Sequence, residues 1–113
     1  MINLLELKRT TQFKKDLKRI IKRGLPTDEL NTVIINLRNQ KPLEPKHFDH
    51  ALTGNFKGFR ECHIMPDWLL MYKVEISTYE EPKGVKVYRY WYTFAMKNNE
   101  IVLSCPYYKH MYI

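Results

Sequence analysis

The chain has 113 residues, of which 44% are hydrophobic and 27% charged, and its formal net charge is +7. This length suits one domain with one core, and no apolar run approaches the ~18 residues that a transmembrane helix needs. The N-terminus lacks the basic-then-apolar order of a signal peptide. We therefore expect a cytoplasmic protein with a single domain over residues 1–113.

The positive charge is concentrated near the N-terminus. Between Lys8 and Arg23 there are eight Lys or Arg residues and a single acid, Asp16, so the remaining chain is neutral overall. A concentrated basic face indicates a polyanionic or acidic partner. The density of positive charge is greater than on an ordinary solvated helix face. The alternative, that these residues form only a solvated surface, also stays open.

The first half of the chain predicts a strand followed by two helices. Residues 2–7 alternate like a short strand. Thr10 or Thr11 then suits the N-cap of a helix with an apolar stripe, and Gly24 suits its end. Thr27 starts a second helix with its own stripe. The expected stripes consist of Phe13, Leu17, Ile20 and Ile21, and of Leu30, Val33, Ile34 and Leu37.

The second half predicts antiparallel strands. Residues 41–50 contain two prolines and no periodicity, so they are expected to form a surface loop. Strands are expected over 56–64, 68–76 and 85–94, with turns at 66–67, 81–84 and 97–99 and a short last strand at 101–103. The order β-α-α-β-β-β(-β) predicts an α+β fold, a helical hairpin packed on a small antiparallel sheet.

A candidate acid–base site lies between residues 49 and 73. His50 and His63 titrate near neutral pH and could share the base and acid roles, while Asp67 could orient an imidazole or carry a proton itself. RNA carries its own nucleophile, the 2′-OH, so cleavage needs a base, an acid and positive charge but no metal. Lys57 and Arg60 could supply that charge, and Trp68 a surface for base stacking. Structural roles for both histidines remain an equal alternative.

Two features limit this site. Arg60 is out of phase with His63 on a regular strand, so both face one site only if the strand ends or bulges between them. The cysteines, Cys62 and Cys105, fit no metal-binding spacing and are expected to be small buried side chains. We expect no metal and no cofactor.

One run in this region resembles a known family. It comprises Asp49-His50-x-Leu52-x-Gly54, Lys57-Gly58-Phe59-Arg60-x-Cys62-His63 and Pro66-Asp67-Trp68-Leu69-Leu70-x-Tyr72-Lys73. It is similar to the YafQ-type branch of the RelE/ParE toxin superfamily, and the resemblance covers roughly residues 1–76.

This resemblance implies the toxin of a type II toxin–antitoxin pair, a metal-independent endoribonuclease that cuts mRNA in the ribosomal A site. By resemblance, His50, His63 and Asp67 match catalytic positions and Trp68 a supporting one. The implied partners are an antitoxin, the ribosome with its rRNA, and mRNA, with no membrane. The rRNA-binding candidates are Lys14, Lys15, Lys18, Arg19, Lys22 and Arg23.

The C-terminal part, about residues 95–113, departs from the family pattern. The family's last strand ends in a short segment with a catalytic His, whereas residues 88–95 contain no His or Gly. Either His110 takes that place by a longer route, with Tyr107 or Tyr108 entering the site, or the site is incomplete. The alternatives are therefore a gyrase-inhibiting toxin of ParE type and a catalytically impaired binding protein with the same fold.

Overall fold

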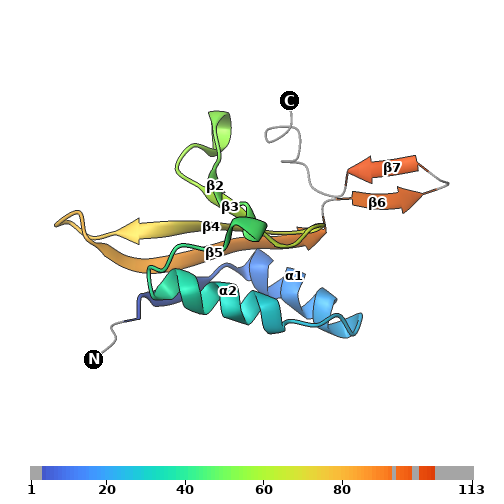
Figure 1. Cartoon of the computed structure of the whole chain (residues 1–113), viewed down its shortest axis with the longest axis horizontal. Coiled ribbons are helices and arrows are strands. Elements are labelled where there is room, and N and C mark those ends of the chain that lie inside the picture. The colour runs from blue at the N-terminus through green and yellow to red at the C-terminus, as the bar shows by residue number, and fades with distance from the viewer. Residues whose placement is uncertain (1–3, 93, 98–99, 104–113) are drawn as a thin grey trace.

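Two helices cover one face of a five-stranded sheet (Figure 1). The computed structural model describes residues 4–92, 94–97 and 100–103. The helices are α1 (Thr11–Lys22) and α2 (Asp28–Arg38). The sheet contains β1 (Glu6–Arg9), β2 (His50–Ala51), β3 (Arg60–Met65), β4 (Trp68–Ile76) and β5 (Pro82–Tyr92). Two 3₁₀ turns, η1 (Pro45–His47) and η2 (Gly54–Phe56), flank β2, and β6 (Phe94–Lys97) pairs with β7 (Glu100–Leu103) as a separate hairpin.

The spatial order of the strands is β1-β5-β4-β3-β2. Strands β3 to β5 form an antiparallel meander, as expected, and the predicted α+β class is confirmed. Strand β2, which pairs antiparallel with β3, was not expected, because residues 41–50 were predicted to be a loop. The first strand differs from the expectation, because β1 pairs with β5 in parallel. Such a pair requires a long crossover connection, and here α1 and α2 lie within it. The sheet is therefore mixed, with β1 as an edge strand.

The turn between β4 and β5 lies earlier than the Pro-Gly signal indicated. Residues 77–81 make the turn: the hydroxyl of Ser77 accepts from the backbone N–H groups of Tyr79 and Glu81, and Glu80 adopts φ 62°. Gly84 instead lies inside β5, where a Cβ would approach the backbone oxygen of Glu6 at 3.1 Å. That glycine allows β1 and β5 to lie close together.

The core lies between the helices and the sheet. All four residues of the α2 stripe are buried, as predicted. In α1, Phe13 and Ile20 are buried, but Ile21 is 57% exposed and the prediction for it was wrong. The third buried residue of α1 is instead Asp16, which is 3% exposed.

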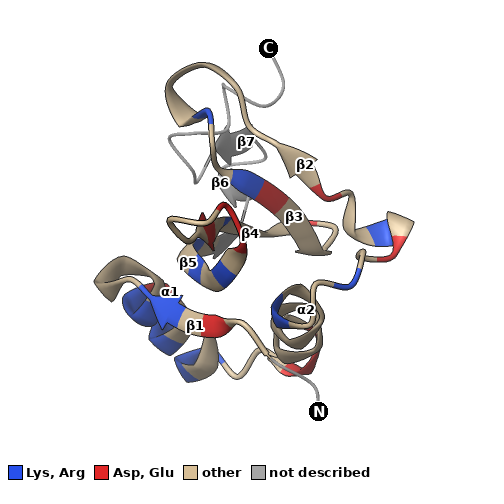
Figure 2. Ribbon diagram, turned by 90° about the vertical axis from the view of Figure 1, so that its left-hand side faces the viewer, with Lys and Arg blue, Asp and Glu red and all other residues tan. Residues whose placement is uncertain are grey.

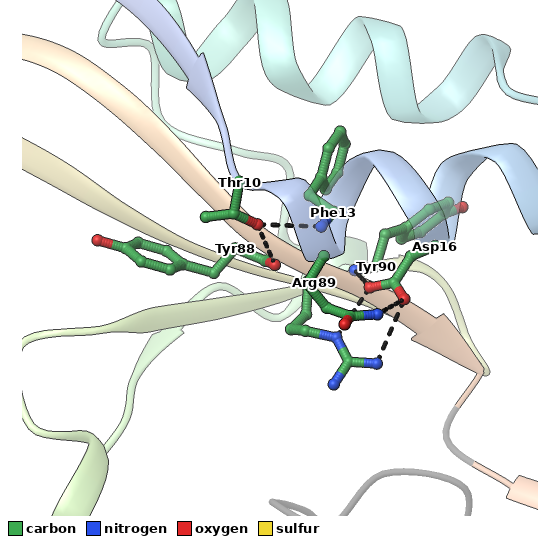
Figure 3. Close-up of polar contacts among 7 residues, drawn as sticks. Thr10, Phe13, Asp16, Tyr88, Arg89 and Tyr90 are labelled. Carbon is green, nitrogen blue, oxygen red and sulfur yellow. Dashed lines mark hydrogen bonds and ion pairs between the residues drawn. The ribbon is translucent and has the colours of Figure 1, made fainter.

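Asp16 is buried because it completes the edge of β5 (Figure 3). Strand β1 ends opposite Val87, so beyond that point the edge of β5 that faces away from β4 lacks a strand partner. The Thr10 hydroxyl donates to the carbonyl of Tyr88 at 2.8 Å and caps α1 by accepting from the N–H of Phe13. Asp16 accepts from the backbone N–H of Tyr90 at 3.1 Å. The start of α1 thus satisfies the backbone polar groups that β1 leaves open.

The other face of the sheet carries a smaller apolar cluster, with Leu52, Leu69 and Met71 buried and Phe56, Phe59 and Tyr88 packed on it. Cys62 is buried on the helix-covered side, as expected, while Cys105 lies outside the described residues. None of the helices in the described part of the chain is long and apolar enough to cross a membrane.

Candidate active site

The structure brings His50 and His63 together at the β2–β3 edge of the sheet. His50 lies in the edge strand β2 and His63 near the end of β3, and their ring centroids are 6.4 Å apart. Each ring is fixed by a backbone carbonyl: Nδ1 of His50 donates to Phe48 at 2.7 Å and Nδ1 of His63 donates to Pro66 at 3.0 Å. Because a carbonyl only accepts, Nδ1 carries the hydrogen in both neutral rings and Nε2 the lone pair. Each ring is thereby prepared to take a proton at Nε2.

A buried carboxyl group, Glu61, lies directly beneath His50. Glu61 is the cross-strand partner of His50, is fully buried, and places Oε1 3.8 Å from Nε2 of His50. No hydrogen bond to either carboxyl oxygen is formed within the described residues. Burial raises the pKa of Glu61 to about 8, because the charged form loses its hydration. The carboxyl is thus largely protonated at neutral pH and can exchange a proton with its surroundings there.

Phe48 lies over both imidazoles in a strained backbone conformation. Its ring centroid is 5.2 Å from that of His50 and 5.9 Å from that of His63. The side chain is 64% exposed, and the residue adopts φ 42°, a left-handed conformation that is unfavourable for a bulky side chain. Such strain persists at functional sites where the surrounding structure imposes it.

Asp49 anchors β2 on the opposite side. The hydroxyl of Tyr72 donates to Asp49 Oδ1 at 2.6 Å, and Nη2 of Arg60 lies 3.2 Å from Oδ2. Because Tyr72 is 1% exposed, this contact ties the strand that carries His50 to the interior of the sheet. The neighbouring residue, His50, is thereby held at a defined distance from β3.

The sheet separates Arg60 from the histidines. Arg60 pairs in register with Tyr72, whose side chain belongs to the helix-covered core, whereas His63 points to the other face. The register shift in β3 lies between His63 and Met65, so it does not place Arg60 on the same face of the sheet as His63. Its proposed role in binding substrate therefore has no geometric support.

The remaining predicted residues that the structure describes are spread over both sides of the sheet. Asp67 is exposed in the turn that supplies the carbonyl to His63, and Lys57 is exposed at the end of η2. Trp68 packs against Tyr90 at 5.7 Å, on the helix-covered side. The five basic candidates of α1 and Arg23, which follows it, are exposed, and Figure 2 marks the Lys and Arg positions in blue. His110, Tyr107 and Tyr108 lie outside the described residues.

Sequence reasoning missed two groups beside the histidines. His47, buried in η1, donates from Nδ1 to the backbone carbonyl of His63 at 2.7 Å and lies 3.2 Å from Glu29 of α2. It holds the backbone of β3 at His63. Glu61 could have been found from the two-residue period of β3, which puts it on the same face as His63. Its contact with His50 depends on the β2–β3 register, which no local pattern shows.

The structure thus consists of two helices on a mixed sheet, with a pair of histidines at one edge. Comparison with known proteins identifies the class to which it belongs. A model described as the bacterial toxin of type II toxin–antitoxin system, YafQ, matches residues 5–80. The chain is therefore a bacterial toxin of the type II class. Within that class it belongs to the YafQ family.

Individual relatives agree with this assignment. The mRNA interferase toxin YafQ of Escherichia coli K12 is 41% identical over 66 residues, covering 56% of this chain and 70% of that protein. The crystal structure of the E. coli DinJ–YafQ toxin–antitoxin complex matches with a TM-score of 0.66 and 30% identity, over 79% of this chain and 92% of the other. A metal-bound toxin from Helicobacter pylori matches with a TM-score of 0.70 and 37% identity, over 79% and 94%. In the described part of the present chain, no three His, Cys, Asp or Glu residues are grouped as metal ligands.

Proposed function

We propose that this chain is the toxin of a type II pair that stops translation by cutting mRNA on the ribosome. The observation that carries the proposal is the pair of imidazoles, each fixed through Nδ1 by a backbone carbonyl, above a buried carboxyl group. The support from relatives is the name of the E. coli protein, mRNA interferase toxin YafQ. The protein would act in the cytoplasm, where translating ribosomes are found.

In the proposed mechanism, the 2′-OH of one ribose attacks the adjacent phosphate. One histidine takes the hydroxyl proton at Nε2 while the other, protonated, gives a proton to the departing 5′-oxygen. A cyclic phosphate and a free 5′-hydroxyl result, and the two histidines exchange protonation states. Positioned acid–base groups of this kind contribute roughly 10²–10⁴-fold each.

Glu61 and Asp67 assist in different ways. Glu61, with its pKa near 8, lies where its charged form would stabilise a protonated His50. Asp67, on the turn next to His63, takes part in proton transfer or orients the phosphate-facing imidazole. The basic face of α1 holds ribosomal RNA through phosphate contacts. A cognate antitoxin neutralises the toxin, as the DinJ–YafQ complex of the relative suggests.

The test is induced expression in bacteria followed by mapping of mRNA 5′ ends. Growth arrest with new cuts inside translated frames is expected for the wild type, and both should disappear in His63→Ala/Asp67→Ala. Tyr79→Ala is the matched control, because Tyr79 is 85% exposed in the β4–β5 turn, and it should behave like the wild type. Arrest without cuts would exclude the nuclease and indicate a protein target such as gyrase. Absence of arrest would indicate a catalytically impaired member of the family.

A further inference from the structure

The sheet face that the helices leave uncovered carries a row of lysines. Lys8 of β1 pairs in register with Lys86 of β5, and Lys86 pairs in register with Lys73 of β4. In-register partners on adjacent strands point to the same face, about 4.8 Å apart. The three lysines therefore occupy neighbouring positions on one face of the sheet, across three strands.

Only one of these lysines is neutralised within the described residues. Lys8 forms a salt bridge with Glu75 at 3.4 Å, whereas no salt bridge of Lys73 or Lys86 occurs in that part of the chain. Like charges directly opposite each other destabilise a sheet. The pair Lys73–Lys86 therefore has an energetic cost in the free protein that an anionic ligand would remove.

Two aromatic rings accompany this pair. Nζ of Lys73 lies 5.3 Å from the ring centroid of Phe59, and Nζ of Lys86 lies 5.3 Å from that of Tyr88. The two rings contact each other edge to face, with centroids 4.8 Å apart. Lysines interleaved with partly exposed aromatic rings are the composition by which proteins bind single-stranded nucleic acid, through phosphate contacts and base stacking.

The position of the patch relative to the histidines is set by the strand register. His63 is opposite Leu69, and Lys73 lies four residues further along β4, about 13 Å at 3.3 Å per residue. Glu61 lies between them on β3, in register with Met71, and is buried. Beyond the lysines, Glu6 and Glu75 flank Gly84 in the next row and would repel a polyanion. The row of positive charge thus ends at an acidic border on the side away from the histidines.

We propose that Lys73 and Lys86, together with the Phe59 and Tyr88 rings, bind the RNA strand on one side of the bond that is cut. The lysines contact backbone phosphates, and a base stacks on the Tyr88 ring. This inference rests on the proposed function, because it gives the path along the sheet that the RNA substrate of the same site would follow. It also assigns single-stranded RNA, rather than ribosomal duplex, to this face.

The experiment measures binding of a short fluorescent single-stranded RNA to the full chain carrying His63→Ala, as a function of salt. Replacing both lysines, Lys73→Gln/Lys86→Gln, should weaken binding and make the slope of log K against log salt shallower by about 1.4, or ~0.7 per lost phosphate contact. The melting temperature should stay the same or rise, because a repulsive pair is removed. A control of equal charge, Lys41→Gln/Lys83→Gln, alters exposed lysines elsewhere and should leave the slope unchanged.

Stacking is tested separately. Tyr88→Leu should weaken RNA binding at least about fivefold at every salt concentration, while Tyr88→Phe retains the ring and should bind like the parent. The proposal would be overturned if Lys73→Gln/Lys86→Gln kept the parental slope of log K against log salt. It would also be overturned if the control Lys41→Gln/Lys83→Gln made the slope equally shallow. Variants of the patch that lost binding to the cognate antitoxin but kept RNA binding would also overturn the proposal, because the patch would then be an antitoxin surface. Cleavage that still depends on His63 in any of these cases would leave the proposed function standing.

Discussion

Asp16 of α1, which is buried, and Arg89 of β5, which is partly exposed, form an ion pair, with Nε of Arg89 2.8 Å from Oδ2 of Asp16. The same carboxylate oxygen accepts the backbone N–H of Tyr90, and Oδ1 accepts from the side chain of Gln12. One buried side chain thus joins the basic helix α1 to β5. A buried carboxylate with this many partners is stable only while all of them are present.

Replacing Asp16 should therefore be costly. Asp16→Ala leaves the Tyr90 N–H and the Arg89 guanidinium without their acceptor, and we expect the free energy of unfolding to fall by about 3 kcal/mol. Urea denaturation measures this loss. Glu81→Ala, at an exposed position, should change the free energy by less than about 0.5 kcal/mol. Equal effects of the two substitutions would contradict the bridging role of Asp16.

Glu61 should make stability depend on pH in an unusual direction. Its pKa rises from an ordinary value of about 4.3 to about 8 in the folded chain. Between these values the folded state holds a proton that the unfolded state lacks, so the free energy of unfolding falls as pH rises. The slope from this group is up to about 1.4 kcal/mol per pH unit.

The variant Glu61→Gln lacks this ionisation and isolates the effect. The difference in stability between wild type and variant should shift in favour of the variant as pH rises from about 5 to about 8. Urea denaturation at several pH values checks this, with Glu81→Gln as an exposed control. A difference that stays constant across this range would show that Glu61 keeps an ordinary pKa.

Phe48 offers a test of backbone strain. At φ 42° a residue with a Cβ is strained by roughly 1–2 kcal/mol, whereas Gly adopts this conformation freely. Phe48→Gly should therefore be about 1 kcal/mol more stable than Phe48→Ala, the reverse of the usual order of these residues. Both variants lose the ring that packs on the two histidines, so both should cleave RNA more slowly than the wild type. If Phe48→Ala were the more stable variant, the conformation would not be strained.

The structure separates what local patterns determine from what depends on tertiary contacts. The bounds of β4 were predicted because it is a nearly continuous apolar run between two turn signals, and the buried stripe of α2 because it follows a period of 3.6 residues. The phase argument for Arg60 was correct because it depends on the two-residue period of a strand. Asp16 was not expected to be buried, because the N–H group that it accepts from, that of Tyr90, lies on another element. The burial of Glu61 was not expected either, because it follows from the pairing of β3 with β2 and β4.

Register is the property that sequence reasoning could not supply. The parallel pairing of β1 with β5 depends on the crossover through both helices, and the row of three lysines exists only because β1, β5 and β4 align as they do. Likewise, the spacing of His50 and His63 made each a candidate, but their approach to 6.4 Å follows from the pairing of a two-residue strand with β3. The stretch from residue 49 to 73 indicated a candidate site only as a region, and the structure supplies the contacts within it.

The basic face of α1 predicts a salt effect distinct from that of the sheet face. Its lysines and arginines are exposed, and the buried Asp16 faces the strand rather than the solvent, so it screens them little. Neutralising Lys14, Lys15, Lys18 and Arg19 should make the salt dependence of ribosome binding shallower by up to about 3, at ~0.7 per contact. Binding of short single-stranded RNA should change much less, because the proposed binding site for that RNA is on the uncovered face of the sheet and not on α1. Sedimentation of the full-length variant with ribosomes over a salt series measures the slope, and an unchanged slope would exclude α1 from the ribosome contact.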